Sequence, residues 1–290
     1  ERYSNSTREV AQDGRRGALM LTISIKHPDA ERFIDAKVDT SKVTGANVSV
    51  KIDDEFMRAA IAGKPYHQQF PIDAEKPMYE QDIDARALWK KIIHNAWKSA
   101  EPGVLFWDTI LRESVPDCYA DEGFNTVSTN PCGEIPLCPY DSCRLLALNL
   151  YSYVDKPFTA EASFDFAKFR DHVGKAMRMM DDIIDLELEK VEQIIAKIDA
   201  DPEEADIRYV ESNLWKKVRE MALKGRRTGL GITAEGDMIA ALGMRYGSDE
   251  AVAFAVEVHK TLALAAYGAS VEMAEERGAF HVCRSEERFS

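Results

Sequence analysis

The chain has 290 residues, of which 45% are hydrophobic and 30% charged, a balance typical of a globular protein with a substantial buried core. Its net charge of −13 argues against binding of a long nucleic acid through a broad basic surface, although a mononucleotide needs only a few local donors. The sequence contains no apolar run of membrane-spanning length and no secretory character at its start, so we expect no membrane association and a cytoplasmic location.

Four apolar stretches have the length of buried strands. They are residues 18–25, 46–50, 104–107 and 145–150. Between and after them, apolar residues recur at helical spacing, often behind an acidic or capping residue. These helices are expected at residues 29–36, from residue 53, at 85–99, at 161–200 with a break near 179–182, from about 206 to 223, and at 248–278. Strands that alternate with helices predict an α/β fold.

Four further expectations concern single segments and residues. Residues 63–82 are polar and contain prolines, which predicts a surface excursion. The last helix is expected to face a core with Val252, Ala255, Val256, Leu262 and Ala263. Methionines in the longest helix are expected to fill a core rather than bind a cofactor, and these are Met177, Met179 and Met180. His27, ahead of the first predicted helix, is expected to be structural.

Residues 128–137 place an amide, a thiol and a carboxylate at alternate positions, Asn130, Cys132 and Glu134. In an extended backbone these side chains would project to the same side. The flanking prolines suit a protruding loop, and Gly133 permits a bend. A thiol beside a hydrogen-bonding amide and a possible base predicts a reaction centre. The alternative is a thiol that simply packs as a small hydrophobe.

The cysteines are odd in number, at positions 118, 132, 138, 143 and 283. Their spacing fits neither a disulfide-dense secreted scaffold nor paired C-x-x-C zinc ligands. We therefore expect reduced thiols and no metal site. A metal-binding or structural module built by the first four cysteines is the non-enzyme alternative.

Residues 107–154, which contain the run NPCGE, resemble the active-site region of ribonucleotide reductase catalytic subunits. The NPCGE form is similar to the adenosylcobalamin-dependent (class II) branch. Residues 12–37 and 225–237 agree with the same family. The resemblance implies part of the ten-stranded α/β barrel of these reductases, with Cys132 on a central finger loop. It also implies that residues 1–290 are the central portion of that barrel domain, incomplete at both ends and inactive alone.

By this resemblance, Cys132 becomes a thiyl radical that removes the 3′ hydrogen of the ribose. Glu134 is then the base at the 3′-OH, and Asn130 holds the ribose hydroxyls. Cys143 matches one of the two cysteines that are oxidised to a disulfide at each turnover. The implied activity is reduction of ribonucleoside diphosphates or triphosphates to 2′-deoxyribonucleotides, with adenosylcobalamin as cofactor.

The resemblance also identifies an effector loop, which tells the active site which nucleotide effector is bound. This loop runs from Gln12 to Met20, and its specificity residues are Gln12, Gly14, Arg15, Arg16, Gly17 and Ala18. From the residues alone, two arginines between glycines indicate either a mobile loop that reaches phosphates or a solvated turn. The implied partners are the ribonucleotide substrate, deoxynucleotide or ATP effectors, a thioredoxin-type reductant, and a second copy in a full-length homodimer.

Residues 225–232 are glycine-rich but match neither G-x-x-x-x-G-K-[ST] nor G-x-G-x-x-G. The family resemblance implies a barrel strand and its following helix here, with glycines that allow close packing. The rival to the class II assignment is a class I large subunit, in which a separate radical-generating subunit replaces cobalamin.

Overall fold

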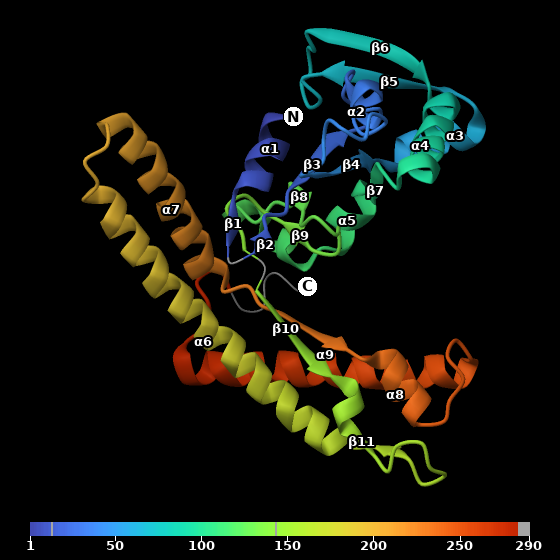
Figure 1. The fold of residues 1–290 in the computed structure, drawn as a ribbon, viewed down its shortest axis with the longest axis vertical. Helices are drawn as coiled ribbons and strands as arrows, with labels where there is room; N and C mark the ends of the chain where they lie inside the picture. The colour runs from blue at the N-terminus through green and yellow to red at the C-terminus, as the bar shows by residue number, and fades with distance from the viewer. Residues whose placement is uncertain (13, 143, 284–290) are drawn as a thin grey trace. The chain divides into compact units, whose positions relative to one another are not determined.

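The computed structural model describes residues 1–12, 14–142 and 144–283, and the chain divides into two compact units, Glu1–Pro139 and Tyr140–Ser290 (Figure 1). Each unit contains parallel strands with helices packed against them, which confirms the α/β fold expected from the sequence. Within the described ranges, no helix combines the length and apolar character that crossing a membrane requires.

A parallel sheet with the strand order β3–β4–β7 forms the centre of the first unit. Its strands are β3 (Met20–Ser24), β4 (Asn47–Ile52) and β7 (Gly103–Phe106). The register pairs Met20 with Asn47 and Ser49 with Gly103. All three strands lie within about two residues of the predicted stretches, because β-branched and leucine side chains pack well on a pleated surface.

Helices cover the apolar face of this sheet. They are α2 (Ala30–Ile34), α3 (Asp54–Ala62) and α4 (Ala85–Ser99). The buried cluster between them and the strands includes Ile25, Ile34, Val50, Ile52, Phe56 and Ile92. Asp53 caps α3 by accepting a hydrogen bond from the Phe56 N–H at 2.7 Å, so the acidic stretch at residues 53–55 is a helix start, as expected. His27 is structural too, because its Nδ1 accepts the Asp29 N–H at 3.0 Å just before α2.

Residues 63–82 are mostly exposed, which confirms the predicted surface excursion, but they contain two strands that were not predicted. They form most of an antiparallel hairpin of β5 (Pro65–Phe70) and β6 (Tyr79–Asp84). Tyr66 and Gln68 of this hairpin are buried, and Gln68 Nε2 donates to Ile25 O at 2.7 Å. The sequence conceals the hairpin because its outward positions are polar and only alternate residues reach the core.

Shorter elements complete the first unit. They are α1 (Arg2–Glu9), β1 (Ala11–Gln12), β2 (Arg15–Arg16), α5 (Trp107–Glu113), the 3-10 segment η1 (Val115–Glu122), β8 (Ser128–Thr129) and β9 (Pro136–Leu137). Strands β1 and β2 pair with each other, and so do β8 and β9. These two hairpins carry most of the predicted functional residues.

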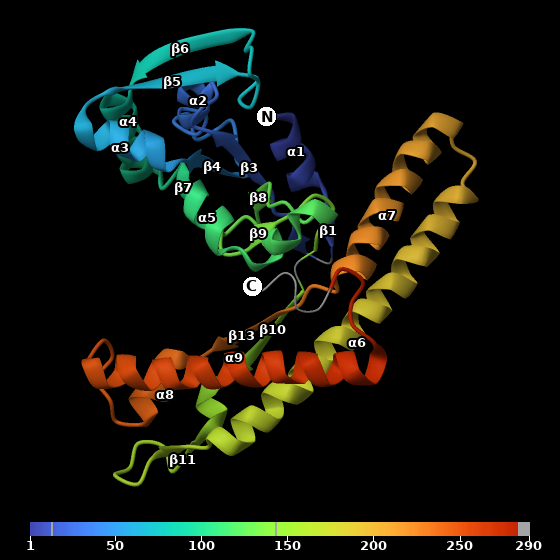
Figure 2. The same ribbon diagram turned by 180° about the vertical axis from the view of Figure 1, so that it is seen from behind.

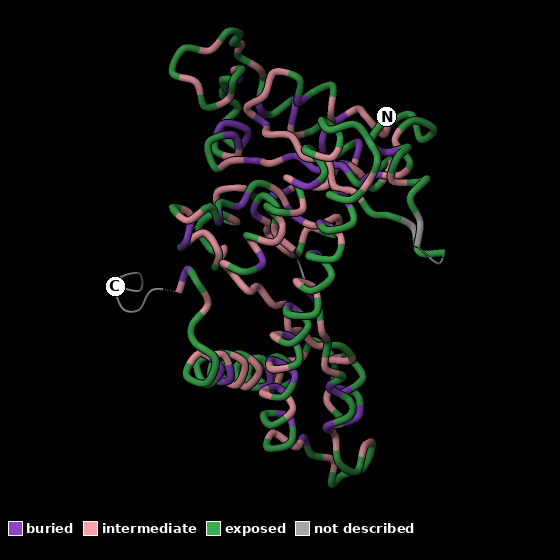
Figure 3. The backbone as a smooth tube through the Cα atoms, turned by 90° about the vertical axis from the view of Figure 1, so that its left-hand side faces the viewer, coloured by how far each residue is buried: buried purple, intermediate pink, exposed green. Residues whose placement is uncertain are grey.

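The second unit is built on a parallel pair, β10 (Leu145–Asn149) and β13 (Gly229–Thr233). Its long helices are α6 (Phe166–Asp199), α7 (Ala205–Gly225) and α9 (Asp249–Arg277), and its shorter elements are η2 (Leu150–Tyr153), β11 (Val154–Asp155), β12 (Ser163–Phe164) and α8 (Glu235–Ala241). Helix α7 runs back along α6, and α9 crosses α6 (Figure 2). Buried residues lie among exposed ones along these helices (Figure 3), and α7 buries only Ser212 and Ala222. The core includes Leu150, Phe169, Val173, Met238 and Val258.

The break expected near residues 179–182 of the longest helix is wrong, since α6 is continuous from Phe166 to Asp199. Its charged stretch stays helical because arginines from other elements bind the carboxylates, as described below. Met177 and Met180 are buried, as expected for core methionines, whereas Met179 is 57% exposed.

The predicted core stripe of α9 is also wrong for most of its members. Val252 and Val256 are each 57% exposed, Ala263 is exposed, and only Leu262 of the stripe packs on the core cluster. The residues of α9 that are buried are Ala251, Val258, Ala269 and Met273. Because this helix is apolar on several sides, its sequence pattern did not single out one face. Its ends were predicted correctly, with Ser248 Oγ accepting the Ala251 N–H at 3.3 Å and Gly278 at the C-cap.

Candidate active site

The segment predicted to react forms a hairpin of β8 and β9. The Asn130 N–H donates to Ile135 O at 3.2 Å and closes the loop between the strands. Inside the loop, the Gly133 N–H donates to Asn130 O at 3.0 Å, so residues 130–133 form a β-turn. Cys132 is the third residue of this turn.

The extended backbone assumed for Asn130, Cys132 and Glu134 is therefore wrong. The chain reverses at Cys132, and Gly133 has a φ of +84°, which confirms the bend expected there. Asn, Pro and Gly are residues that the commonest β-turn favours at its first, second and fourth positions, so this turn was readable from the sequence. Cys132 and Glu134 are both exposed, which contradicts a merely packed thiol.

Asn130 helps to shape this turn. It is half-buried, and its Oδ1 accepts the Ile135 N–H at 2.9 Å. The carbonyl end of the side chain therefore fixes the loop. The amide nitrogen, Nδ2, takes no part in this hydrogen bond.

One face of the sheet β3–β4–β7 carries the reactive hairpin. Along β4, the polar residues Asn47, Ser49 and Lys51 alternate with the apolar residues Val48, Val50 and Ile52. Because neighbouring side chains in a strand point to opposite faces, the first three share the face opposite to the helices. Polar residues at every second position of an apolar strand are the sequence signal for this face, which was not among the predicted functional features.

Hydrogen bonds join this face to the hairpin. They link Thr22 Oγ1 with Ser128 Oγ at 3.3 Å, Asn47 Nδ2 with Pro131 O at 2.9 Å, and Lys51 Nζ with Val127 O. A Cβ added to Gly133 would lie 3.7 Å from Leu105 Cδ2, so the turn itself also approaches this face. The hairpin is therefore held along its length, from Val127 to the turn.

Lys51 anchors the stem of the hairpin. Burial lowers the pKa of its ammonium group below the ordinary value. The Trp107 ring, whose centre lies 4.0 Å from Nζ, and the Val127 carbonyl replace part of the hydration that the ammonium loses.

The predicted effector loop is a short hairpin, in which Gln12 pairs with Arg15. Gly14 has a φ of +81° at its turn, and Gly17 closes its base by donating to Val10 O at 3.2 Å. A Cβ on Gly17 would lie 2.9 Å from Thr7 O, so this glycine is required by close backbone approach. Of the predicted residues, Gly14, Arg15, Gly17 and Ala18 are exposed, and the side chains of Gln12 and Arg16 lie outside the description.

Cys143, the predicted redox cysteine, lies outside the described residues, but both of its flanks are fixed. On one side, Asp141 pairs with Arg227. On the other, Arg144 is 7% exposed and makes a bidentate ion pair with Glu187, with an Nη2–Oε1 distance of 2.9 Å. These buried and half-buried pairs limit the movement of the backbone on either side of position 143.

The glycine-rich residues 225–232 form the end of α7 and the start of β13. Helix α8 follows β13, which confirms the strand and following helix that the resemblance implied. Gly229 allows close packing, since its added Cβ would lie 2.9 Å from Arg144 O, whereas Gly231 faces open space. Arg226 Nε donates to Asp181 Oδ1 at 2.7 Å, so this arginine is bound to α6.

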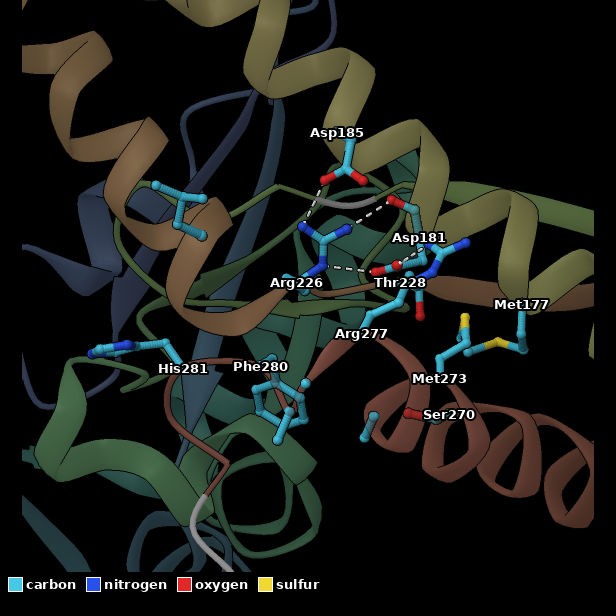
Figure 4. A pocket seen from close by; sticks show the side chains of 14 residues that line it. Met177, Asp181, Asp185, Arg226, Thr228, Ser270, Met273, Arg277, Phe280 and His281 are labelled. Atoms are coloured by element: carbon cyan, nitrogen blue, oxygen red, sulfur yellow. Dashed lines mark hydrogen bonds and ion pairs between the residues drawn. The ribbon is translucent and has the colours of Figure 1, made fainter.

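A cavity of about 380 Å³ lies beside this arginine in the second unit, and Figure 4 shows the ion pairs in its wall. Burial opposes ionisation of Asp181, but hydrogen bonds and charge interactions with Arg226 and Arg277 outweigh it and lower the pKa of the carboxyl. Asp181, Asp182 and Asp185 are close enough together to hold a metal, yet both arginines already bind this cluster.

The metal module considered for the first four cysteines includes Cys143, which lies outside the described residues. Among the described residues, the group placed closely enough to hold a metal is the aspartate cluster above, and it includes no cysteine. Cys138 is buried, whereas Cys118 is exposed.

Comparison with known proteins supplies the family. The family model for the ribonucleotide reductase barrel domain matches residues 2–288. The chain belongs to the ribonucleotide reductase family. This membership confirms the resemblance carried by the NPCGE run and the barrel architecture expected from it.

Two relatives are named vitamin B12-dependent ribonucleoside-diphosphate reductase. The protein from Thermoplasma acidophilum is 35% identical over 280 residues, which cover 96% of this ribonucleotide reductase chain and 32% of the relative. The protein from Mycobacterium tuberculosis is 32% identical over 281 residues, which cover 96% of this chain and 35% of the relative. The chain thus spans about a third of the length of these relatives.

A solved structure shares the fold. It is the alpha subunit of the class Id ribonucleotide reductase from Actinobacillus ureae, with a TM-score of 0.62 and 19% identity. The match covers 91% of this ribonucleotide reductase chain and 42% of that subunit.

Proposed function

We propose that the full-length protein reduces ribonucleotides to 2′-deoxyribonucleotides by thiyl-radical chemistry, and that adenosylcobalamin starts the reaction. The single observation that carries this proposal is the match of a ribonucleotide reductase barrel model to nearly the whole chain. The names of the two relatives support the cofactor. The position of Cys132, on an exposed turn rather than in a core, supports the radical role.

Adenosylcobalamin, when bound, supplies a radical by cleavage of its cobalt–carbon bond. A thiol that gives up its hydrogen atom to such a radical must be reachable by a large organic group. Cys132 meets this requirement, because it is exposed at the third position of a turn. The proposal assigns no residue of this chain to the binding of the corrin ring.

In the proposed reaction, the Cys132 sulfur removes the 3′ hydrogen of the ribose, and Glu134 accepts the proton of the 3′-OH. Asn130 donates from Nδ2 to a ribose hydroxyl, because its Oδ1 is used within the loop. The 2′ C–O bond then breaks and water leaves. Cys143 and a second thiol supply two electrons and two protons and become a disulfide, and the 3′ hydrogen returns to the sugar.

The remaining partners follow from the same proposal. A thioredoxin-type reductant restores the two thiols, and deoxynucleotides or ATP bind as effectors near residues 12–18. The full-length protein is a homodimer in the cytoplasm, and the 290-residue chain alone is inactive because its relatives are about three times as long.

The test is turnover by the full-length protein with ribonucleoside diphosphates and triphosphates, with and without adenosylcobalamin. Deoxynucleotide formation that requires the cofactor supports the proposal. Formation without cobalamin, but with a separate radical-generating subunit, identifies a class I enzyme instead. The variant Cys132→Ser tests the role of the thiol itself, and turnover near the wild-type rate in this variant would refute that role.

A further inference from the structure

Asn47 is hydrogen-bonded to both loops of the candidate site. Its backbone N–H donates to Leu19 O at 2.8 Å, and Leu19 lies near the end of the predicted effector loop, residues 12–20. Its side-chain Nδ2 donates to Pro131 O at 2.9 Å, and Pro131 directly precedes Cys132. One residue thus links the end of the effector loop to the turn that carries the reactive thiol.

The place of Asn47 in the sheet accounts for this double contact. Asn47 is the first residue of β4 and pairs with Met20, the first residue of β3. The effector loop leads into β3 at this end of the parallel strands, and the turn of the reactive hairpin contacts the same end. A movement of Leu19 therefore pulls on the backbone of Asn47, and a short side chain with two rotatable bonds passes the displacement to Pro131.

The other contacts of the hairpin make such a movement selective. Thr22–Ser128 and Lys51–Val127 hold the stem on the sheet. Asn47 contacts the turn itself, one residue before the thiol. A displacement at Asn47 would therefore act on the turn, while Thr22 and Lys51 hold the stem.

We propose that Asn47 is a positioning residue that couples the effector loop to the turn bearing Cys132. The proposal rests on the function proposed above and names a residue through which an effector alters substrate preference. Asn47 touches neither substrate nor effector in this account. Its contribution is to set where the sulfur stands for a given state of the effector loop.

The decisive variant is Asn47→Asp in the full-length enzyme. Aspartate keeps the size of the side chain and the backbone bond to Leu19, but its carboxylate cannot donate to the Pro131 carbonyl. Asn125→Asp is the matched control, because Asn125 Nδ2 also donates to a carbonyl at 2.9 Å, that of Ala120, which belongs to neither loop. Asn47→Ala is the second variant, should the aspartate disturb folding.

The measurement is the ratio of kcat/KM for two ribonucleotides under two different deoxynucleotide effectors. Effector affinity with and without substrate is measured as well, because coupling between two sites is reciprocal. For Asn47→Asp, the effector-induced change in both quantities should shrink by roughly two- to tenfold, the equivalent of one hydrogen bond. The control should keep the wild-type response.

Unchanged coupling in a folded Asn47→Asp enzyme would overturn the proposal, and so would a uniform loss of turnover with all substrates, which indicates a purely structural role. A wild-type enzyme that reduces ribonucleotides without any effector response overturns it too. These results differ from failure of the proposed function, in which the wild-type enzyme forms no deoxynucleotide at all.

Discussion

Gly229→Ala tests the close approach of β13 to the segment after Cys143. A Cβ at this position would lie 2.9 Å from both Arg144 O and Leu145 Cδ2, so the strands must separate. Separation also stretches the hydrogen bond of 2.8 Å from the Gly229 N–H to Arg144 O. Overpacking costs about 1–3 kcal/mol and the weakened bond about 1 kcal/mol, while alanine regains about 0.4–1 kcal/mol by restricting the unfolded chain. We expect a net loss of about 2 kcal/mol.

Gly231→Ala is the matched control, because it lies on the same strand and nothing stands within 4 Å of its added Cβ. It should leave the stability unchanged or raise it by up to about 1 kcal/mol. The assay is hydrogen exchange of peptides that contain β10 and β13. A loss of about 2 kcal/mol corresponds to roughly thirtyfold faster exchange for Gly229→Ala. Equal exchange in the two variants would refute the packing argument.

Two further substitutions probe the ion pairs of the second unit. Glu187→Gln removes the charge that the buried Arg144 requires, and it should cost about 2–3 kcal/mol, less than for a fully buried pair because Glu187 is 27% exposed. Thermal unfolding checks this value, with the exposed Glu189→Gln as a control that should change stability by less than about 0.5 kcal/mol. Asp181→Asn should destabilise the protein most near neutral pH. Since the folded-state pKa of Asp181 lies below that of the unfolded chain, its stabilisation is complete above about pH 4 and is lost as the pH falls through the folded-state pKa. The free energies of unfolding of wild type and Asp181→Asn, measured in urea, should therefore differ more at pH 7 than at pH 3. An equal difference at both pH values would contradict the role of the pair with Arg226.

The regular elements of this chain were largely readable from its sequence, where one face of a segment was clearly apolar. Helix α4 matches its predicted range of residues 85–99, because apolar spacing and a following Pro-Gly both mark it. The β5–β6 hairpin was missed, since residues 63–82 send only alternate side chains to the core. The buried face of α9 was misassigned, since valines such as Val252 lie on its exposed side.

The candidate site was predictable in its residue types and less so in its geometry. The thiol, amide and carboxylate were identified from their order, but the extended backbone assumed for them was wrong because Asn130 to Gly133 form a turn. The residues that hold this hairpin on the sheet were not predicted. Asn47 and Lys51 lie about 80 residues before the turn in sequence, and only the pairing of strands in space brings them beneath it.

The most direct test of the central claim compares Cys132→Ser with Cys143→Ser in the full-length enzyme. Both receive adenosylcobalamin and a ribonucleotide labelled with tritium at the 3′ carbon, and release of tritium to water is measured beside deoxynucleotide formation. The account predicts neither tritium release nor product for Cys132→Ser. For Cys143→Ser it predicts tritium release with at most one impaired turnover, because hydrogen abstraction precedes reduction. Deoxynucleotide formation near the wild-type rate by Cys132→Ser would contradict the account.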